Sequence, residues 1–220
     1  MNKFPKDFVW GTATSSYQIE GASDLDGKGP SIWDAFSGIP GKTHNGETGE
    51  IACDHYHKYK EDIQLMKNMG VKAYRFSIAW PRVMPTGKDS INEQGLQFYS
   101  DLIDGLLEAG ITPWVTLYHW DLPLALQLED DGWLGDSISN HFEAYAKLCF
   151  ERFGDRVKNW ITLNEPWVVA ILGYGQGVFA PGRISTSEPY LAAHNLLLAH
   201  GKAVNLFRKK FAHQNGTIGI

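Results

Sequence analysis

The stretch that decides the fold is residues 93–120, which read EQGLQFYSDLIDGLLEAGITPWVTLYHW. Its first part repeats apolar residues every three or four positions, from Leu96 to Leu107, which is typical of an amphipathic helix. Gly110 follows where such a helix is expected to end, and the run 112–120 has the aromatic and β-branched residues of a strand. A helix that leads into a strand apolar on both faces is the unit of a parallel α/β sheet.

The same alternation continues along the whole chain. We expect strands at Phe8–Thr14, Ala73–Trp80, Thr112–Trp120, Asn159–Glu165 and, as a stub, Thr217–Ile220. We expect helices at Asp54–Met69, Glu93–Ala109, Ser137–Phe153 and Glu188–Phe211. Because the strands begin about 52 residues apart, a barrel of eight such units would need roughly 420 residues, within the range of large (β/α)8 barrels. The sequence therefore predicts the first four βα units and the start of the fifth strand of a TIM barrel, a half barrel that forms one domain over residues 1–220.

An open doubly wound sheet is the alternative α/β architecture. It predicts a glycine-rich phosphate loop of the G-x-G-x-x-G type after the first strand. Residues 11–16 read GTATSS instead, and a loop of about forty residues follows. This departure counts against a nucleotide-binding fold.

Composition excludes several classes of function. The chain has 220 residues, of which 43% are hydrophobic and 20% charged, as in an ordinary globular domain. A formal net charge of −5 provides no basic surface, so we expect no nucleic-acid partner. The longest apolar stretch falls far short of the ~20 residues that span a bilayer, and the N-terminus lacks the apolar core of a signal peptide. We therefore expect no membrane association and a cytoplasmic location.

A metal site is not expected. Cys53, His55 and His57 form a cluster of residues of ligand type, but His55 and His57, two positions apart, point in different directions on a helix. A fourth ligand at zinc spacing is missing. The two cysteines do not make a disulfide framework either.

Polar side chains gather at the expected carboxyl ends of the strands, which is the edge where TIM barrels carry their sites. They are Gln18 after the first strand, Arg75 in the second, His119 and Trp120 at the end of the third, and Asn164 and Glu165 at the end of the fourth. The chain is also rich in aromatic residues, which make up 13% of it. That content fits a well-filled core or a cleft that stacks the flat faces of sugars, and composition alone favours the core.

Glu165 is the first candidate for chemistry. It follows the apolar strand residues 160–163 and precedes Pro166 and a second apolar run. Apolar surroundings favour the protonated form of a carboxyl, which suits a proton donor near neutral pH. A structural role is equally open, because Glu165 could cap a short helix with Pro166 at its first position. Structural roles are open for the others too: Gln18 could fix a loop, His119 could be a core histidine, and Arg75 could join strands by an ion pair.

Four segments resemble glycoside hydrolase family 1, the β-glucosidase family. They are Phe8–Gly21 (FVWGTATSSYQIEG), Tyr74–Arg82 (YRFSIAWPR), Tyr118–Pro123 (YHWDLP) and Thr162–Pro166 (TLNEP). The resemblance runs in order across the chain and covers the N-terminal half of a typical member. It implies a TIM barrel that hydrolyses terminal β-glycosidic O-linkages with retention and needs no metal or other cofactor.

The resemblance also implies roles for individual residues. Glu165 would be the general acid/base, and Asn164 would bind the 2-hydroxyl of the sugar. Arg75 would support the site beside the nucleophilic carboxylate. Glu20 and Asp121 are expected to be structural or supporting.

The remaining site residues are implied to bind substrate. Gln18 and His119 would bind hydroxyls of the glycone, and Trp120 would line the same subsite. Trp167 would form an aromatic platform for the leaving group. The substrate is expected to be a β-glucoside or a related small saccharide.

The nucleophile implied by the resemblance has no match in this sequence. In the family it is a glutamate in a Thr/Ile-Glu-Asn-Gly motif after the seventh strand, and the Asn-Gly pairs Asn45-Gly46 and Asn215-Gly216 lack the preceding glutamate. Retaining glycosidases need two carboxyl groups about 5–5.5 Å apart. We therefore expect the isolated chain to be inactive. The alternative function is a non-catalytic relic or a carbohydrate-binding half barrel.

The open sheet edges of a half barrel predict a protein partner. Unpaired strands and uncovered interior side chains drive association with a complementary C-terminal half or self-association. We expect the chain to be a fragment of a longer β-glucosidase-like sequence. A split enzyme with a separate C-terminal chain and a self-paired dimer are the alternatives.

Overall fold

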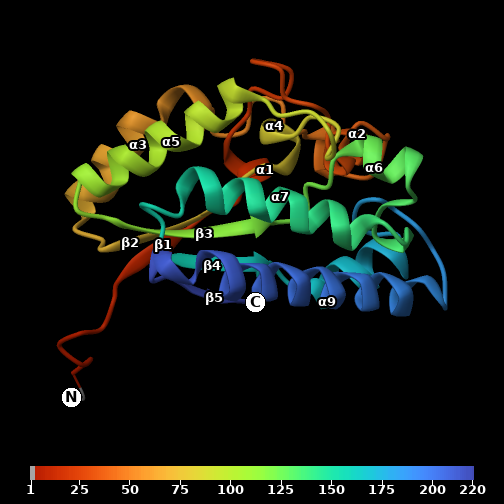
Figure 1. Ribbon diagram of the computed structural model, residues 1–220. Coiled ribbons are helices and arrows are strands. Elements are labelled where there is room, and N and C mark those ends of the chain that lie inside the picture. The colour runs from red at the N-terminus through yellow and green to blue at the C-terminus, as the bar shows by residue number, and fades with distance from the viewer. Residues whose placement is uncertain (1–2) are drawn as a thin grey trace.

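The computed structural model describes residues 3–220, which form a curved parallel sheet flanked by helices (Figure 1). The strands are β1 (Gly11–Ala13), β2 (Ala73–Ser77), β3 (Thr112–Tyr118), β4 (Asn159–Leu163) and β5 (Thr217–Gly219). They lie in the order β1-β2-β3-β4-β5, and every neighbouring pair is parallel. This is the order that consecutive βα units produce, so the predicted alternation of strands and helices is confirmed.

Four long helices return the chain from the end of one strand to the start of the next. They are α3 (His55–Met69), α5 (Glu93–Glu108), α7 (Ile138–Phe153) and α9 (Glu188–Leu206). In Figure 1, α3, α5 and α7 lie above the sheet and α9 runs alongside β4 and β5. Gly70, directly after α3, and Gly110, two residues after α5, have φ of 76° and 74°, as the sequence predicted for helix ends.

The shorter elements were not predicted as separate elements. They are α1 (Ser16–Ile19), α2 (Ile32–Ser37), η1 (His44–Gly46), α4 (Trp80–Val83), α6 (Leu124–Glu129), η2 (Gly132–Leu134), α8 (Pro166–Val168), the π-helices η3 (Val169–Gly173) and η4 (Phe207–Phe211), and η5 (Ala212–Gln214). Three of them, α1, α4 and α8, begin three residues after the end of β1, β2 and β4. Each strand therefore leads directly into a tight helical turn that fixes the residues at its carboxyl end.

Some predicted boundaries are wrong. The strand expected at 73–80 ends at Ser77, because Pro81 favours the first turn of α4, which begins at Trp80. The strand expected at 8–14 is limited to β1, since the rings of Phe8 and Trp10 pack against each other, with centroids 4.7 Å apart, instead of extending the sheet. The helix expected at Glu188–Phe211 has the predicted ends, but its part after Leu206 is the π-helix η4.

The two faces of the sheet differ in burial. Side chains that point toward the helices, such as Tyr74, Val115 and Trp160, are almost fully buried. On the other face, Arg75 pairs in register with Trp114, which is 37% exposed. Within residues 3–220, β1 pairs only with β2 and β5 only with β4, so the sheet is open at both edges. The described helices include none that is long and apolar enough to cross a bilayer.

Packing between α7 and the sheet fixes the carboxyl ends of two strands. The ring of Tyr145 stacks on Trp80, with centroids 4.8 Å apart and planes at 9°. Its buried hydroxyl lies 3.1 Å from the carbonyl oxygen of Ile78 and 2.7 Å from that of Leu117. A single tyrosine therefore holds the end of β2 against the end of β3, directly below the edge that carries the candidate site.

Candidate functional site

The predicted site residues lie at one edge of the sheet, because the strands are parallel and their carboxyl ends meet there. Gln18 is in α1, Arg75 in β2, His119 and Trp120 directly follow β3, Asn164 and Glu165 directly follow β4, and Trp167 is in α8. The side chains form two groups, one around Arg75 and one around a cavity. The structure leaves Trp167 outside both, as a residue that is 66% exposed.

The first group is centred on the guanidinium of Arg75. Its Nε donates a hydrogen bond of 3.0 Å to Thr116 Oγ1, and its Nη2 donates one of 2.6 Å to Asn164 Oδ1. Burial lowers the pKa of Arg75, and the negative charge of Glu165 acts in the opposite direction. Glu165 is the only carboxylate of residues 3–220 whose charge contributes to that pKa shift.

Asn164 is fixed on three sides. Its backbone N–H donates to the carbonyl oxygen of Tyr118, 2.9 Å away, and its own carbonyl oxygen accepts from Trp120 Nε1 at 3.0 Å. Since Oδ1 of its side chain accepts from Arg75, the NH2 group of the amide points away from Arg75. This orientation leaves the NH2 as a hydrogen-bond donor for a ligand.

Glu165 adopts a left-handed backbone conformation, with φ of 49° and ψ of 61°. Such angles are uncommon for residues other than glycine and are frequent at functional sites. The residue stands at the N-cap of α8, but its carboxylate makes no capping hydrogen bond within the described chain. The expectation of apolar surroundings is wrong for this chain, because the side chain of Glu165 is exposed. Its apolar neighbours Leu163 and Val169 are instead buried.

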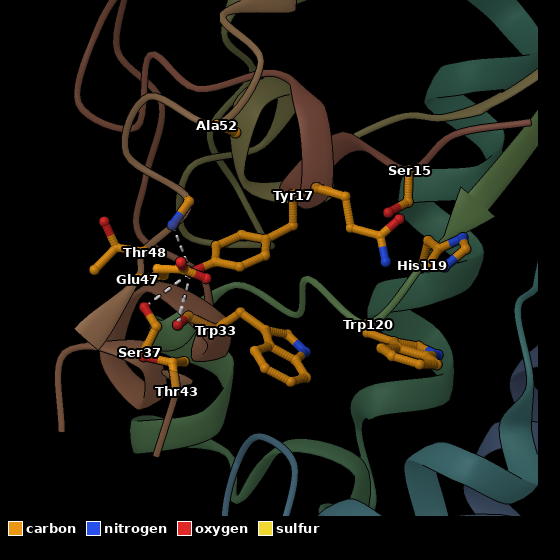
Figure 2. Close-up of a pocket in the computed structure, with 12 residues that line it drawn as sticks. Ser15, Tyr17, Trp33, Ser37, Thr43, Glu47, Thr48, Ala52, His119 and Trp120 are labelled. Carbon is orange, nitrogen blue, oxygen red and sulfur yellow. Dashed lines mark hydrogen bonds between the residues drawn. The ribbon is translucent and has the colours of Figure 1, made fainter. Parts of the chain in front are cut away.

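The second group lines a cavity of about 330 Å³. Gln18, His119 and Trp120 lie on its wall together with Tyr17 and Trp33 (Figure 2). The indoles of Trp120 and Trp33 are stacked, with centroids 6.2 Å apart and planes at 21°. Flat aromatic walls combined with a few polar groups suit a small polyhydroxylated ligand.

His119 is neutral at neutral pH. Burial, and then the positive charge of Arg75, lower the pKa of His119 to about 4. Its Nδ1 is buried and has no hydrogen-bond partner among residues 3–220. A neutral imidazole offers one N–H donor and one acceptor nitrogen. The two groups of the site meet here, since Trp120, next in sequence to His119, also binds the backbone of Asn164.

The aromatic residues Tyr17 and Trp33 of the cavity wall were not predicted as site residues. Trp33 lies in α2, within the long connection between β1 and α3, where no periodic pattern marks it. Tyr17 holds it in place, because its hydroxyl donates to the carbonyl oxygen of Trp33 at 3.1 Å. The same hydroxyl lies 2.9 Å from Ser37 Oγ and accepts from the N–H of Gly49 at 3.2 Å (Figure 2). For Trp33 the high aromatic content was the available signal, whereas Tyr17 lies within the segment Phe8–Gly21 that resembles the family.

Residues expected to be structural have structural contacts. Glu20 is buried, pairs with Arg82 Nε at 3.0 Å and accepts from the Tyr99 hydroxyl at 2.5 Å. His55 Nδ1 lies 2.6 Å from Asp62, and His57 Nδ1 lies 2.6 Å from Asp54. The two histidines thus contact different carboxylates, and residues 3–220 contain no group of three or more possible metal ligands.

Comparison with known proteins gives a consistent result. The model of glycosyl hydrolase family 1 matches residues 1–220. β-Glucosidase A of Thermotoga maritima is 56% identical over 220 residues, which are 100% of this chain and 49% of the relative. β-Glucosidase 1B of Phanerodontia chrysosporium is 56% identical over 233 residues, 100% of this chain and 43% of the relative. The chain therefore spans about half the length of the curated relatives it matches.

Solved structures agree with the sequence relatives. The Thermotoga maritima β-glucosidase in complex with castanospermine superimposes with a TM-score of 0.97 at 56% identity, covering 100% of this chain and 49% of that one. A rice β-glucosidase mutant in a covalent complex with Glc superimposes with a TM-score of 0.96 at 50% identity, covering 99% and 48%. The fold is thus that of half of a (β/α)8 β-glucosidase barrel, as predicted.

Proposed function

Because the chain belongs to glycosyl hydrolase family 1, we propose that it carries the acid/base half of a retaining β-glucosidase site. The observation that carries the proposal is the group formed by Arg75 in β2 and by Asn164 and Glu165 at the end of β4. A free carboxylate on a constrained backbone stands there beside an oriented amide donor. The reaction is the hydrolysis of terminal β-D-glycosidic O-linkages.

Glu165 would act as general acid and then as general base. It would donate its proton to the departing glycosidic oxygen, and in the second step it would remove a proton from the attacking water. Asn164 would donate its NH2 hydrogen to the sugar 2-hydroxyl. The contact between Asn164 and Arg75 supports this role, since it fixes the amide before substrate binds.

The cavity beside Trp120 would hold the glycone. Gln18 and neutral His119 would bind its hydroxyls, and the indole of Trp120 would pack against the sugar ring. Trp167, exposed beyond Glu165, would contact the leaving group. The Thermotoga maritima relative binds castanospermine and glucoimidazole, and the rice relative is covalently linked to Glc. These ligands support a glucose-configured substrate for this chain.

The nucleophile would come from a second polypeptide segment. Retention requires a second carboxylate about 5–5.5 Å from Glu165. The charge balance around Arg75 supports this step, because Glu165 is the only carboxylate of residues 3–220 that contributes to its pKa shift. A carboxylate from a complementary half would face the open side of the sheet, where Arg75 could receive it. Without that half, the exposed inner face would favour self-association.

The test is an assay of an aryl β-glucoside with the 220-residue chain alone and mixed with the remaining half of the Thermotoga maritima relative. The proposal predicts turnover only in the mixture, and loss of that turnover in Glu165→Gln. Absence of turnover in both samples, together with binding of castanospermine, would favour a carbohydrate-binding role. Turnover by the chain alone would contradict the proposed division of the two carboxylates.

A further inference from the structure

Asp121 is a buried carboxyl that the proposed mechanism does not use. It is 2% exposed, and its Oδ2 accepts a hydrogen bond from the Ser16 hydroxyl. Its Oδ1 is buried and has no hydrogen-bond partner within residues 3–220. A carboxyl without a cationic partner at hydrogen-bond distance is unfavourable in a protein interior. Such a residue is a candidate for a role other than stability.

The hydrogen bonds of Asp121 connect the ends of three strands. The Ser77 hydroxyl, at the end of β2, donates to Ser16 Oγ at 2.9 Å, and the Ser16 hydroxyl, after β1, donates to Asp121, which follows β3. The backbone N–H of Ser16 also donates to Ser77 Oγ at 2.7 Å. The hydroxyl bonds all point in one direction and end on the carboxyl, an arrangement in which each bond strengthens the next.

Two members of this chain of bonds, Ser16 and Asp121, stand two residues from the glycone-binding side chains. Ser16 and Gln18 belong to the same short helix, α1, and Asp121 is two residues after His119. Gln18 and His119 line the same cavity. We propose that Asp121 is a positioning residue that, through Ser16, fixes Gln18 relative to His119 on the wall of the glycone cavity. The ligand-binding roles of Gln18 and His119 rest on the proposed function. The hydrogen bonds among Ser77, Ser16 and Asp121 are independent of it.

The surroundings of Asp121 indicate which substitution preserves the hydrogen bond from Ser16. Burial raises the pKa of Asp121 to about 7; nearby Glu20 acts in the same direction, and the Ser16 hydroxyl and the charge of Lys28 act in the opposite one. Asp121 and Asp34 both line a second, small cavity, in which Asp34 is already paired with Lys28 at 3.2 Å. A proton on Oδ1 leaves Oδ2 free to accept from Ser16. An asparagine reproduces that neutral form, with an oxygen for Ser16 and an NH2 in place of Oδ1.

The experiment records the NMR signals of the Gln18 side-chain amide and the His119 ring in the isotope-labelled 220-residue chain. The variants are Asp121→Leu and Ser16→Ala, which remove the hydrogen bond between these two residues, and Asp121→Asn, which keeps an acceptor for the Ser16 hydroxyl. Ser139→Ala is the matched control, because Ser139 is also a buried serine but binds Lys202, on α9. Castanospermine affinity is measured in parallel.

The proposal predicts that both signals shift in Asp121→Leu and Ser16→Ala and stay in place in Asp121→Asn and Ser139→Ala. The affinity for castanospermine should fall about tenfold in Asp121→Leu and Ser16→Ala, which corresponds to the loss of one hydrogen bond to the ligand. A merely structural role would lower the melting temperature in Ser139→Ala and Ser16→Ala alike without selective shifts, which would contradict the proposal. If Asp121→Leu does not fold, Ser16→Ala decides. Failure of the unmodified chain to bind castanospermine would count against the proposed function and leaves the signal shifts to decide the positioning role.

Discussion

Arg75 donates a 2.6 Å hydrogen bond to the side chain of Asn164 and thereby joins β2 to β4 across the intervening strand β3. Thr116 of β3 accepts a second bond from the same guanidinium. Three consecutive strands therefore share one cation on the open face of the sheet. The orientation of the amide next to Glu165 depends on that cation.

Removal of this guanidinium should destabilise the chain. Arg75→Met leaves Thr116 Oγ1 and Asn164 Oδ1 without their donor, and we expect a loss of about 1–3 kcal/mol in the free energy of unfolding. Urea denaturation at pH 7 measures it. Arg152→Met is the control, because Arg152 forms an exposed pair with Glu93 and should change stability very little. Equal effects of the two substitutions would refute a special role for Arg75.

The cavity wall should tolerate no side chain at residue 49. A Cβ added to Gly49 would lie 2.7 Å from the ring of Tyr17, so Gly49→Ala must displace the ring that supports Trp33. We expect a destabilisation of about 1–3 kcal/mol and a changed environment of the Trp33 indole. Gly201→Ala in α9 meets no atom within 4 Å and should stabilise by about 0.5–1 kcal/mol. Thermal unfolding and tryptophan NMR signals distinguish the two.

His119 should make the fold sensitive to acid. Its pKa is about 4 in the folded chain and 6.5 in the unfolded one, so the unfolded state takes up a proton first as pH falls. Stability is therefore retained above pH 6.5 and is lost progressively between pH 6.5 and 4, by at most about 3 kcal/mol. His119→Gln should remove this part of the pH dependence. If the free energy of unfolding changes equally for the two proteins between pH 7 and 4, the expectation is wrong.

Asp121 should have the opposite pH dependence. Its pKa is about 7 when folded and 3.8 when unfolded, so the unfolded state loses its proton first as pH rises. Stability is then lost between pH 3.8 and 7, by up to about 4 kcal/mol. Asp121→Asn should be more stable than the unmodified chain at pH 8 and similar to it at pH 4. Urea midpoints at the two pH values measure the difference, and Asp136→Asn, an exposed site, should show none.

The sequence predicted the parallel order of strands because helix and strand periodicities are local properties. It also located Gln18, His119 and Asn164 at one edge, since residues that follow parallel strands must meet there. Trp33 could not be found in this way. It lies in a short helix inside a long connection, and the Tyr17 hydroxyl, a tertiary contact, holds it at the cavity.

The environment of Glu165 also depends on tertiary structure. Its sequence neighbours are apolar, but the strand and helix turn them into the core while the left-handed backbone of Glu165 directs its own side chain to the surface. Local hydrophobicity therefore gives no reliable estimate of burial at the end of a strand. The same holds for Asp121, whose partner Ser16 is 105 residues away in sequence.

The role of Glu165 as proton donor is tested most directly by how the loss of activity in Glu165→Gln depends on the leaving group of the substrate. Glu165→Gln is assayed in the mixture with a complementary half, on an alkyl β-glucoside and on a β-glucoside of an acidic phenol, with Glu151→Gln on the outside of α7 as control. An alkoxide needs a proton to depart, whereas an acidic phenolate does not. We expect the rate of the first step, departure of the leaving group, to fall by about 10²–10⁴-fold for the alkyl glucoside. For the glucoside of the acidic phenol, the rate of the same step should fall far less. An equal loss for both substrates, or no loss for either, would contradict the assignment of Glu165 as the acid.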